Sequence, residues 1–187
     1  MNITVFCGAS VGNDNIYQEK TIELGLWMVK NGHSLVYGGG KVGLMGVIAD
    51  TVLENGGKVI GVIPTFLIDR EICHGNLAEL ITVDNMSDRK TYMVENGDAF
   101  IALPGGPGTL EEISQVISWA RVGQNDGPCI LYNVNGYYDH LESFYNNMVQ
   151  EGFLSLEDRE KTLFSDNLDE IEDFIKNYSE PAVRQYK

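Results

Sequence analysis

The stretch most able to do chemistry is a glycine-rich turn that leads into a helical pattern. Residues 104–112 read Pro-Gly-Gly-Pro-Gly-Thr-Leu-Glu-Glu and follow an apolar run. This composition favours a tight strand-to-helix turn. The free N–H groups of a helix N-terminus, together with the helix dipole, form a site for phosphate without any basic side chain. We therefore expect a phosphate group to bind at this turn.

The acid that closes this stretch, Glu112, has two interpretations. Residues 109–112 (Thr-Leu-Glu-Glu) match a capping box, in which Thr109 caps the helix and Glu112 reaches back to the amide of Thr109. The other interpretation makes Glu112 a catalytic carboxylate close to the phosphate. The residues alone favour the cap. Neighbouring Glu111 is expected to point away and to be a solvated acid in the first helical turn.

A second glycine-rich turn occupies residues 38–43 (Gly-Gly-Gly-Lys-Val-Gly) and fits the pattern GxGxxG between a strand and a helix. The acid that would bind the ribose of a dinucleotide is missing, because the next strand ends Gly-Val-Ile-Pro-Thr at residues 61–65. A P-loop fails too, since Lys41 is followed by valine. Two alternatives remain open: Gly39 and Gly40 let the backbone approach a ligand, or the glycines only make a tight turn.

These turns need strands and helices to position them, and the sequence alternates the two. Apolar, β-branched runs predict strands at residues 3–7, 35–37, 59–63, 80–83, 99–103, 129–134 and 162–164. Helical patterns cover residues 15–31, 44–55, 88–96, 110–122, 139–151 and 168–178. We predict an α/β fold with a doubly wound, Rossmann-like, mainly parallel sheet of about seven strands flanked by helices. Ligands of such sheets bind at the carboxyl edge of the strands.

The chain has 187 residues, of which 43% are hydrophobic, as expected for one globular domain. We assign residues 1–180 to a single domain and residues 181–187 to a frayed C-terminal tail. The segment 64–75 departs from the alternation and predicts a loop or short helix near the site. His74 and Glu71 in this segment are weighed as contacts to a base or as surface residues.

The net charge of −14 disfavours partners that are themselves polyanions. We expect no binding to nucleic acid or to a membrane, whereas a small phosphate ligand can still bind a locally positive pocket. The cysteines and histidines have no zinc-binding spacing, and we predict neither a metal nor a cofactor. The N-terminus resembles no signal peptide, so we expect a cytoplasmic protein.

Two linked motifs carry a family resemblance. Residues 104–112 match the PGGxGTxxE signature of the Lonely Guy family, cytokinin riboside 5′-monophosphate phosphoribohydrolases that are often mislabelled as lysine decarboxylases. Residues 86–90 (Met-Ser-Asp-Arg-Lys) resemble the family's M-x-x-R-K motif at the usual distance upstream. The similarity extends to residues 7–10, 38–45 and 136–139, and so covers nearly the whole chain.

The resemblance implies a set of site residues. Arg89 and Glu112 would be the catalytic pair, and the nucleotide phosphate would bind at four residues of the turn: Gly105, Gly106, Gly108 and Thr109. Further substrate-binding candidates are Met86, Lys90, Gly39, Gly40 and Ser10. The implied substrate is a purine nucleoside 5′-monophosphate, either AMP or an N6-modified form, cleaved to the free base and ribose 5-phosphate. Short members of the family are usually homodimers whose active sites use residues of both subunits, so at this length the resemblance implies a homodimer.

The chemistry assigns different roles to the two catalytic candidates. Cleavage of an N-glycosidic bond passes through an oxocarbenium-like state, which the Glu112 carboxylate would stabilise while it orients the attacking water as a general base. Arg89 stays protonated, so it would hold phosphate or ribose and stabilise the departing base. The alternative for Arg89 is a salt bridge on the helix surface. Lys90 is expected to face another direction and to play a supporting part.

Other functions remain open on the sequence. A glycosyl transferase would use Glu112 as a covalent nucleophile, and a non-enzymatic nucleotide or cofactor carrier would use the same phosphate turn without turnover. A decarboxylase is the weakest alternative, because a pyridoxal enzyme needs a Schiff-base lysine and a partner for the ring nitrogen. Arg121 stands where many relatives are expected to have glutamine, which we expect to alter an interface or the base pocket.

Overall fold

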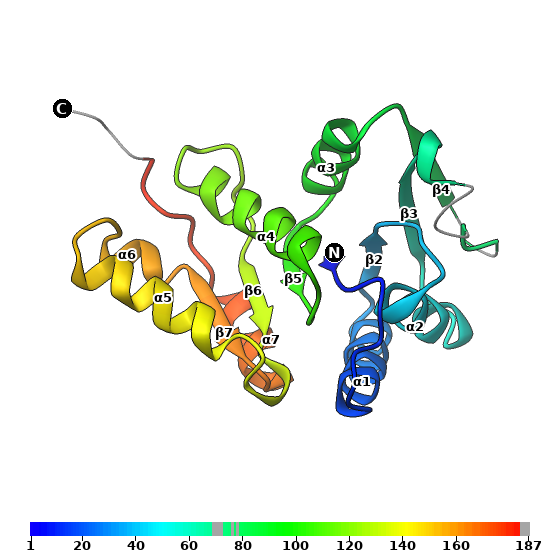
Figure 1. Ribbon diagram of the computed structural model, residues 1–187, viewed down its shortest axis with the longest axis horizontal. Coiled ribbons are helices and arrows are strands. Elements are labelled where there is room, and N and C mark those ends of the chain that lie inside the picture. Colours follow the sequence, from blue (N-terminus) through cyan, green and yellow to red (C-terminus); the bar gives the residue numbers. More distant parts are fainter. Residues whose placement is uncertain (69–72, 76, 78, 184–187) are drawn as a thin grey trace.

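The computed structural model describes residues 1–68, 73–75, 77 and 79–183. Seven strands form one sheet in the order β4-β3-β2-β1-β5-β6-β7, and every pairing is parallel (Figure 1). The strands are β1 (Asn2–Phe6), β2 (Ser34–Tyr37), β3 (Val59–Pro64), β4 (Glu79–Val83), β5 (Ala99–Ala102), β6 (Cys129–Tyr132) and β7 (Thr162–Ser165). The predicted doubly wound, Rossmann-like sheet is confirmed.

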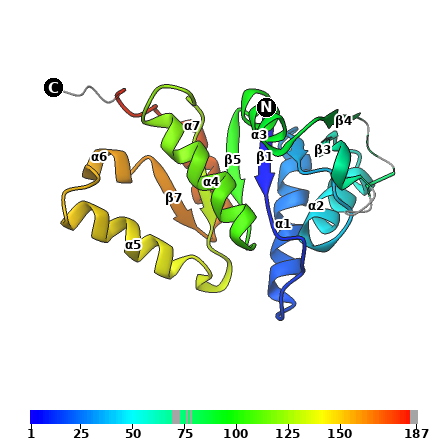
Figure 2. The same ribbon diagram turned by 45° about the horizontal axis from the view of Figure 1, so that its top comes forward.

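Helices cover both faces of this sheet. They are α1 (Ile16–Lys30), α2 (Gly43–Glu54), α3 (Met86–Glu95), α4 (Pro107–Ala120), α5 (Asp139–Gln150), α6 (Leu156–Arg159) and α7 (Leu168–Lys176). Two short 3-10 turns, η1 (Thr65–Leu67) and η2 (Val134–Gly136), follow β3 and β6. Figures 1 and 2 show α1 and α2 on one side of the sheet and α3 and α4 on the other.

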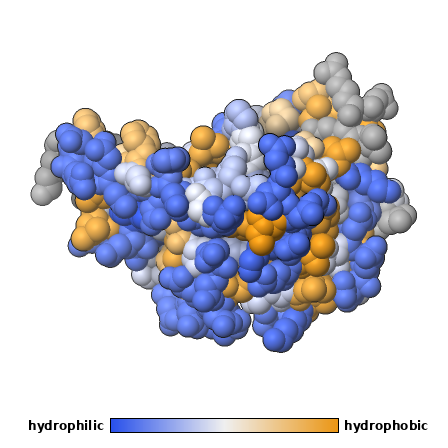
Figure 3. All heavy atoms as spheres, turned by 60° about the horizontal axis from the view of Figure 1, so that its bottom comes forward, coloured by the Kyte–Doolittle hydropathy of each residue, from blue (hydrophilic) through white to orange (hydrophobic). Residues whose placement is uncertain are grey.

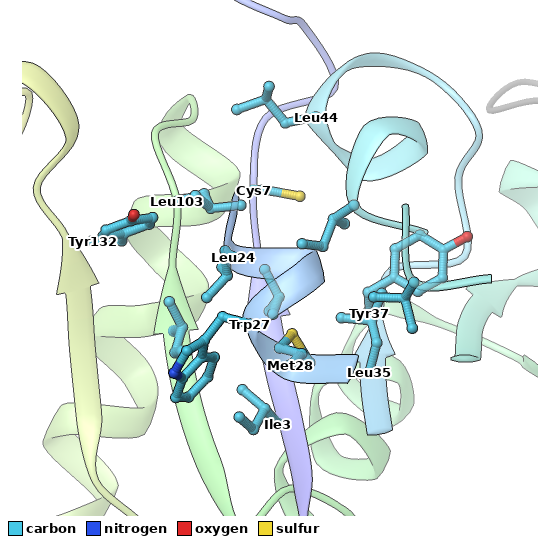
Figure 4. Close-up of a cluster of buried hydrophobic side chains, with 14 of the residues drawn as sticks. Ile3, Cys7, Leu24, Trp27, Met28, Leu35, Tyr37, Leu44, Leu103 and Tyr132 are labelled. Atoms are coloured by element: carbon cyan, nitrogen blue, oxygen red, sulfur yellow. The ribbon is translucent and has the colours of Figure 1, made fainter. Parts of the chain in front are cut away.

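The two hydrophobic layers follow from the alternation of side chains along the buried strands. On β1, Ile3 and Val5 belong to the cluster that includes Met28 of α1, and Figure 4 shows this layer between α1 and the strands. Phe6 belongs to the opposite cluster, with Met93 of α3. Both faces of each central strand are therefore buried, which explains the nearly continuous apolar runs in the sequence.

The order of the strands reverses at β1, which lies between β2 and β5. The turns that leave the carboxyl ends of these strands are joined by backbone hydrogen bonds. The amide of Gly8 donates to the carbonyl of Pro104 at 3.1 Å, and the amide of Leu44 donates to the carbonyl of Gly8 at 3.0 Å. Ligands of open α/β sheets bind at such a switch point, so the fold itself indicates where the site lies.

Two helices near this point begin earlier than predicted. Helix α3 begins at Met86 because the side chain of Asn85 accepts the amide of Asp88 at 3.0 Å and caps it. Helix α4 begins at Pro107, in the position where proline needs no amide partner, with Gly106 as its cap residue. Thr109 is therefore already inside the helix. The predicted capping box between Thr109 and Glu112 is wrong, because it requires a later helix start.

The remaining differences are small. The sequence patterns do not predict α6, whose cap is the side chain of Ser155. The segment 64–75 contains the short helix η1, and a short helix is one of the two forms that the sequence predicts there. Residues 69–72, which include Glu71, lie outside the described part. The expected tail is described only to Val183, and its fraying stays a prediction. Among the described residues, no helix is long and apolar enough to span a membrane.

Candidate active site

A cavity of about 310 Å³ lies at the carboxyl edge of the central strands. Its walls come from β1 and the turn after it, from the turns after β2 and β5, and from α2, η1, α3 and α4. The lining residues are Val5, Phe6, Cys7, Gly8, Ala9, Gly38, Met45, Leu67, Met86, Arg89, Met93, Gly106, Gly108, Thr109 and Glu112. This is the switch point of the sheet, so the fold and the cavity agree on one location.

The N-terminus of α4 forms one wall of the cavity. Gly106, Gly108 and Thr109 line it, and they lie at the cap position and in the first turn of the helix. The first amides of a helix have no partner inside the helix, and the helix dipole makes this end partly positive. The wall is therefore suited to an anion such as a phosphate group.

Glu112 lines the same cavity from the second turn of α4. It lies three residues beyond Thr109, and residues at this spacing share one face of a helix. Glu111 faces another way, and its carboxylate pairs with the ammonium of Lys90 at 2.5 Å, with 55% of the Glu111 side chain exposed. Of the two adjacent acids, only Glu112 therefore reaches the cavity.

Arg89 enters the cavity from the first turns of α3 and is only 6% exposed. Its Nη2 donates to the carbonyl of Gly38 at 2.9 Å, and Nη1 lies 3.8 Å from the sulfur of Met86. The Nε donor is buried and has no partner in the described part of the chain. The ion pairs formed within that part do not include Arg89, so a surface salt bridge does not explain this arginine.

Cys7 lies in the same wall but is unsuited to be a nucleophile. Burial raises the pKa of its thiol far above the ordinary value, and the charge of Glu112 raises it further, against a smaller opposite effect of Arg89. The thiol therefore stays protonated at neutral pH. Cys7, Arg89 and Glu112 all line this one cavity.

Gly105 supports the cavity wall without lining it. A side chain at Gly105 would overlap the hydroxyl of Thr109, so the turn can close only around glycine. The Gly105 carbonyl accepts the hydroxyl of Tyr137 at 2.5 Å, and the carbonyl of Leu103 accepts the hydroxyl of Tyr138 at 2.7 Å. Two consecutive tyrosines between η2 and α5 thus hold the backbone around the glycine turn by hydrogen bonds.

Besides Gly105, four of the substrate-binding candidates lie outside the lining of this cavity. Lys90 pairs with Glu111, and Ser10 accepts the amide of Gly12 at 3.3 Å on an exposed turn. Gly39 packs against Ile63 with a positive φ, and Gly40 forms a bridge with Cys73. The six others that reach the lining are Arg89, Glu112, Gly106, Gly108, Thr109 and Met86. Their roles stay predictions.

Two other residues weighed on the sequence also lie elsewhere. His74 is 3% exposed and its Nε2 lies 2.8 Å from the carboxylate of Asp50, so it is a packed residue outside the cavity lining. Arg121 donates from Nε to the carboxylate of Asp158 at 3.1 Å and joins the end of α4 to α6. This pair gives Arg121 a local structural role away from the cavity.

Sequence reasoning missed the apolar part of the site. Met45, Met93 and Leu67 line the cavity but belong to no chemical motif. A signal for Met93 was present, because it follows Arg89 by four residues and Met86 by seven, which places all three on one face of a helix. For Leu67 no such signal exists, since the segment after β3 has no period. Within the described residues, no group of acids, histidines and cysteines could hold a metal.

Known proteins resemble this chain over most of its length. The family model described as "Possible lysine decarboxylase" matches residues 45–175. The cytokinin riboside 5′-monophosphate phosphoribohydrolase LOG1 of Arabidopsis thaliana is 44% identical over 187 residues, which cover 98% of this chain and 88% of the relative. A probable enzyme of the same name from Oryza sativa subsp. japonica, LOGL2, is 46% identical over 177 residues, covering 95% and 72%.

Solved structures add a likeness in fold. The Moco carrier protein from Chlamydomonas reinhardtii matches with a TM-score of 0.69 at 19% identity, covering 94% of each chain. The molybdenum cofactor binding protein from Rippkaea orientalis matches with a TM-score of 0.68, also at 19% identity, covering 94% of each chain. At this identity the likeness extends to the fold alone.

Proposed function

The chain belongs to the Lonely Guy family of cytokinin riboside 5′-monophosphate phosphoribohydrolases, and from this premise we propose that it is an N-glycosidase. Its substrates are adenosine 5′-monophosphates, with or without an N6 substituent. The products are the free base, a cytokinin or adenine, and ribose 5-phosphate. The family model covers residues 45–175, which include Arg89 and Glu112, and the named relatives are phosphoribohydrolases.

One observation carries the proposal: a single cavity is lined by the amide end of α4, the carboxylate of Glu112 and the guanidinium of Arg89. Binding and cleavage of a nucleoside monophosphate require all three kinds of group close together in one cavity. The phosphate takes the helix end around Gly106 and Thr109. The ribose then lies beside Glu112, one turn further along the same helix. The base reaches toward the methionine-lined wall.

Hydrolysis at this site follows from the charges. A water molecule attacks C1′, the bond from C1′ to the base nitrogen breaks, and its electron pair leaves with the base. The Glu112 carboxylate accepts the proton of the water and stabilises the positive charge that develops on the sugar. The Arg89 guanidinium, which stays protonated, stabilises the negative charge of the departing base. Solvent supplies the proton that the base finally takes.

The residues of the cavity argue against a pyridoxal enzyme. Such an enzyme forms a Schiff base with a lysine, and no lysine is among the described residues that line the cavity. Lys90, the nearest in sequence to Arg89, is paired with Glu111. The family description "Possible lysine decarboxylase" therefore has no support in the chemistry of this site.

The experiment is chromatography of the products formed from AMP and from its N6-isopentenyl analogue. Wild type is expected to release base and ribose 5-phosphate in equal amounts. The change Glu112→Gln removes the charge at constant size and is expected to lower kcat by about 10²-fold or more. Glu111→Gln is the matched control, because it changes the adjacent acid outside the cavity, and it should keep nearly the wild-type rate.

Three outcomes would overturn this proposal or its mechanism. Full activity of Glu112→Gln would remove the carboxylate from the chemistry. Exchange of labelled adenine into AMP, in place of net release, would indicate a glycosyl transferase with Glu112 as nucleophile. Tight AMP binding with no release of adenine would indicate a carrier.

We also propose that the enzyme works as a cytoplasmic homodimer. Large apolar side chains are exposed in the cavity lining or next to it: Met86 of the lining at 37%, and its neighbours Phe66 at 49% and Leu110 at 42%. A second copy would cover this apolar rim and complete the wall of the site. The cysteines of the described chain form no disulfide, which fits a reducing compartment. Light scattering at working concentration is expected to give twice the mass of the 20.7 kDa chain.

A further inference from the structure

Gly38 is the first residue after β2 and lines the cavity beside Arg89, although 51 residues separate the two in the chain. It opens the glycine-rich turn whose role the sequence leaves undecided. The turn contains glycines of two kinds. Gly39 and Gly43 have positive φ angles of 76° and 63°, so the backbone conformation itself demands glycine. Gly38 has no such angle, and another cause must account for it.

The cause is the guanidinium of Arg89. A Cβ atom at Gly38 would overlap Nη2 of Arg89 and would lie 3.0 Å from Cζ. The missing side chain therefore makes the space that the guanidinium fills. In that space Nη2 donates to the carbonyl of Gly38 at 2.9 Å, so the same residue supplies both the room and the acceptor.

The surroundings fix the guanidinium from several sides. The sulfur of Met86 lies 3.8 Å from Nη1, and the sulfur of Met45 would lie 3.3 Å from a Cβ at Gly38. The buried Nε keeps an unused donor within the described chain. A planar group held in this way presents its remaining donors in a fixed direction, which is the condition for stabilising charge without reorganisation.

We propose that Gly38 is a positioning residue: it holds the Arg89 guanidinium against the cavity by leaving room for it and accepting one of its hydrogen bonds. This inference rests on the proposed function for the catalytic role of Arg89. The position of the guanidinium follows from the structure alone. The first glycine of the GxGxxG pattern thus serves an arginine from α3 and contacts no dinucleotide.

The test is a double-mutant cycle on the hydrolysis of AMP. Gly38→Ala is expected to displace the guanidinium and to lower kcat/KM by about 10²-fold. Arg89→Ala should lower it by a similar factor. The double variant is expected to be no worse than Arg89→Ala alone, because the methyl group has nothing left to displace. Gly75→Ala is the control, since a Cβ there meets nothing within 4 Å.

A second readout separates positioning from general disturbance of the turn. Added guanidinium ion is expected to restore part of the activity of Arg89→Ala, because the slot beside Gly38 is then empty. The same ion should not restore the double variant, where the alanine methyl fills the slot. If Gly38→Ala fails to fold, the double variant should fold, since the overlap is gone.

Several results would overturn the proposal: wild-type activity of Gly38→Ala, losses that multiply in the double variant, or equal rescue with and without the methyl group. A crystal structure of Gly38→Ala gives a measure that needs no turnover. The guanidinium should leave the Gly38 carbonyl. A guanidinium that still donates to the Gly38 carbonyl would overturn the inference. Absence of AMP hydrolysis by wild type would count only against the proposed function.

Discussion

At the scale of single residues, Arg89 is a source of instability. Its guanidinium is 6% exposed, and the ion pairs of the described chain leave it without a carboxylate. It also lies near the N-terminus of α3, where the helix dipole disfavours a positive charge. A buried cation with incomplete compensation destabilises the fold. Such a residue is expected at a functional site, where stability is given up for chemistry.

The change Arg89→Met should therefore stabilise the protein while it removes activity. We expect the free energy of unfolding to rise by about 1 kcal/mol, and the melting temperature by about 2–4 °C. Calorimetry without nucleotide measures the first effect, and product release from AMP measures the second. A lower melting temperature would mean that Arg89 is held mainly for structure.

The residues of the site differ in how readily the sequence identifies them. Glu112 and Arg89 stand in two motifs, and the family resemblance of these motifs singles them out, although the residues alone favour a cap for Glu112. Gly38 cannot be assigned to Arg89 in this way, because only the packing of α3 over the end of β2 brings them together. The same holds for Leu67, whose place in the lining depends on the course of an irregular segment.

At the scale of elements, the glycine turn before α4 is held by the residues between η2 and α5. The hydroxyl of Tyr137 donates to the carbonyl of Gly105 at 2.5 Å. The ring of Tyr137 also meets that of Tyr138 edge to face, with centroids 5.0 Å apart. The aromatic pair and its hydrogen bonds thus fix the backbone whose amides face the cavity.

Tyr137→Phe is expected to loosen this turn without unfolding the protein. Loss of one hydrogen bond is worth about 1 kcal/mol, so KM for AMP should rise about five-fold, with a smaller change in kcat. Steady-state kinetics measure both. Tyr178→Phe serves as the control, because Tyr178 follows α7 and lies outside the cavity lining. An unchanged KM in Tyr137→Phe would show that the turn holds its shape alone.

The junction of α1 with β2 contains a half-buried histidine. His33 packs against the ring of Trp27 at 5.3 Å, and its Nδ1 is buried without a partner in the described chain. Burial is the main cause that lowers the pKa of His33, the positive N-terminus adds to the shift, and Glu172 opposes it. The folded protein therefore prefers His33 neutral.

This shift predicts a loss of stability in mild acid. As the pH falls below about 6.5, His33 of the unfolded chain takes up a proton before His33 of the folded protein does. This protonation stabilises the unfolded state relative to the folded state. The loss of folding stability continues until the pH falls below the lowered pKa of His33. Urea unfolding from pH 8 to pH 5 should show a falling midpoint for wild type relative to His33→Gln. A constant difference between the two would contradict the expectation.

The elements themselves are largely readable from the sequence, because period and composition mark buried strands and amphipathic helices. The starts of α3 and α4 are not. Both are decided by cap residues. Asn85 makes α3 begin two residues earlier than the pattern predicts, and the Gly106-Pro107 step makes α4 begin three residues earlier. That small shift explains why the pattern makes Glu112 look like a cap residue, although it lies in the second turn.

At the scale of the whole molecule, the net charge of the protein repels the proposed substrate. The chain carries a net charge of −14, and Figure 3 shows hydrophilic residues over most of one face. A nucleoside monophosphate is itself a dianion at neutral pH. The average field of the protein therefore repels the ligand, which the helix end and Arg89 attract only at short range.

Salt should consequently help binding. Raising NaCl from about 20 mM to about 200 mM screens the long-range repulsion and is expected to lower KM for AMP about two-fold. Steady-state kinetics at several ionic strengths measure the effect, with binding of uncharged adenosine as the control. A KM that rises with salt would mean that the local positive field of the site dominates the approach.

The joined turns at the switch point limit how this family can diversify. Hydrogen bonds from Gly8 to Pro104 and from Leu44 to Gly8 tie three turns into one unit, so inserted or deleted residues in any of them would disturb the other two. The start of the connection between β3 and β4, at η1, takes no part in these two hydrogen bonds, yet it supplies Leu67 to the cavity. Evolution toward new bases should therefore proceed by changes in length and sequence of that connection, and loop exchange between relatives is the direct way to transfer a substrate preference.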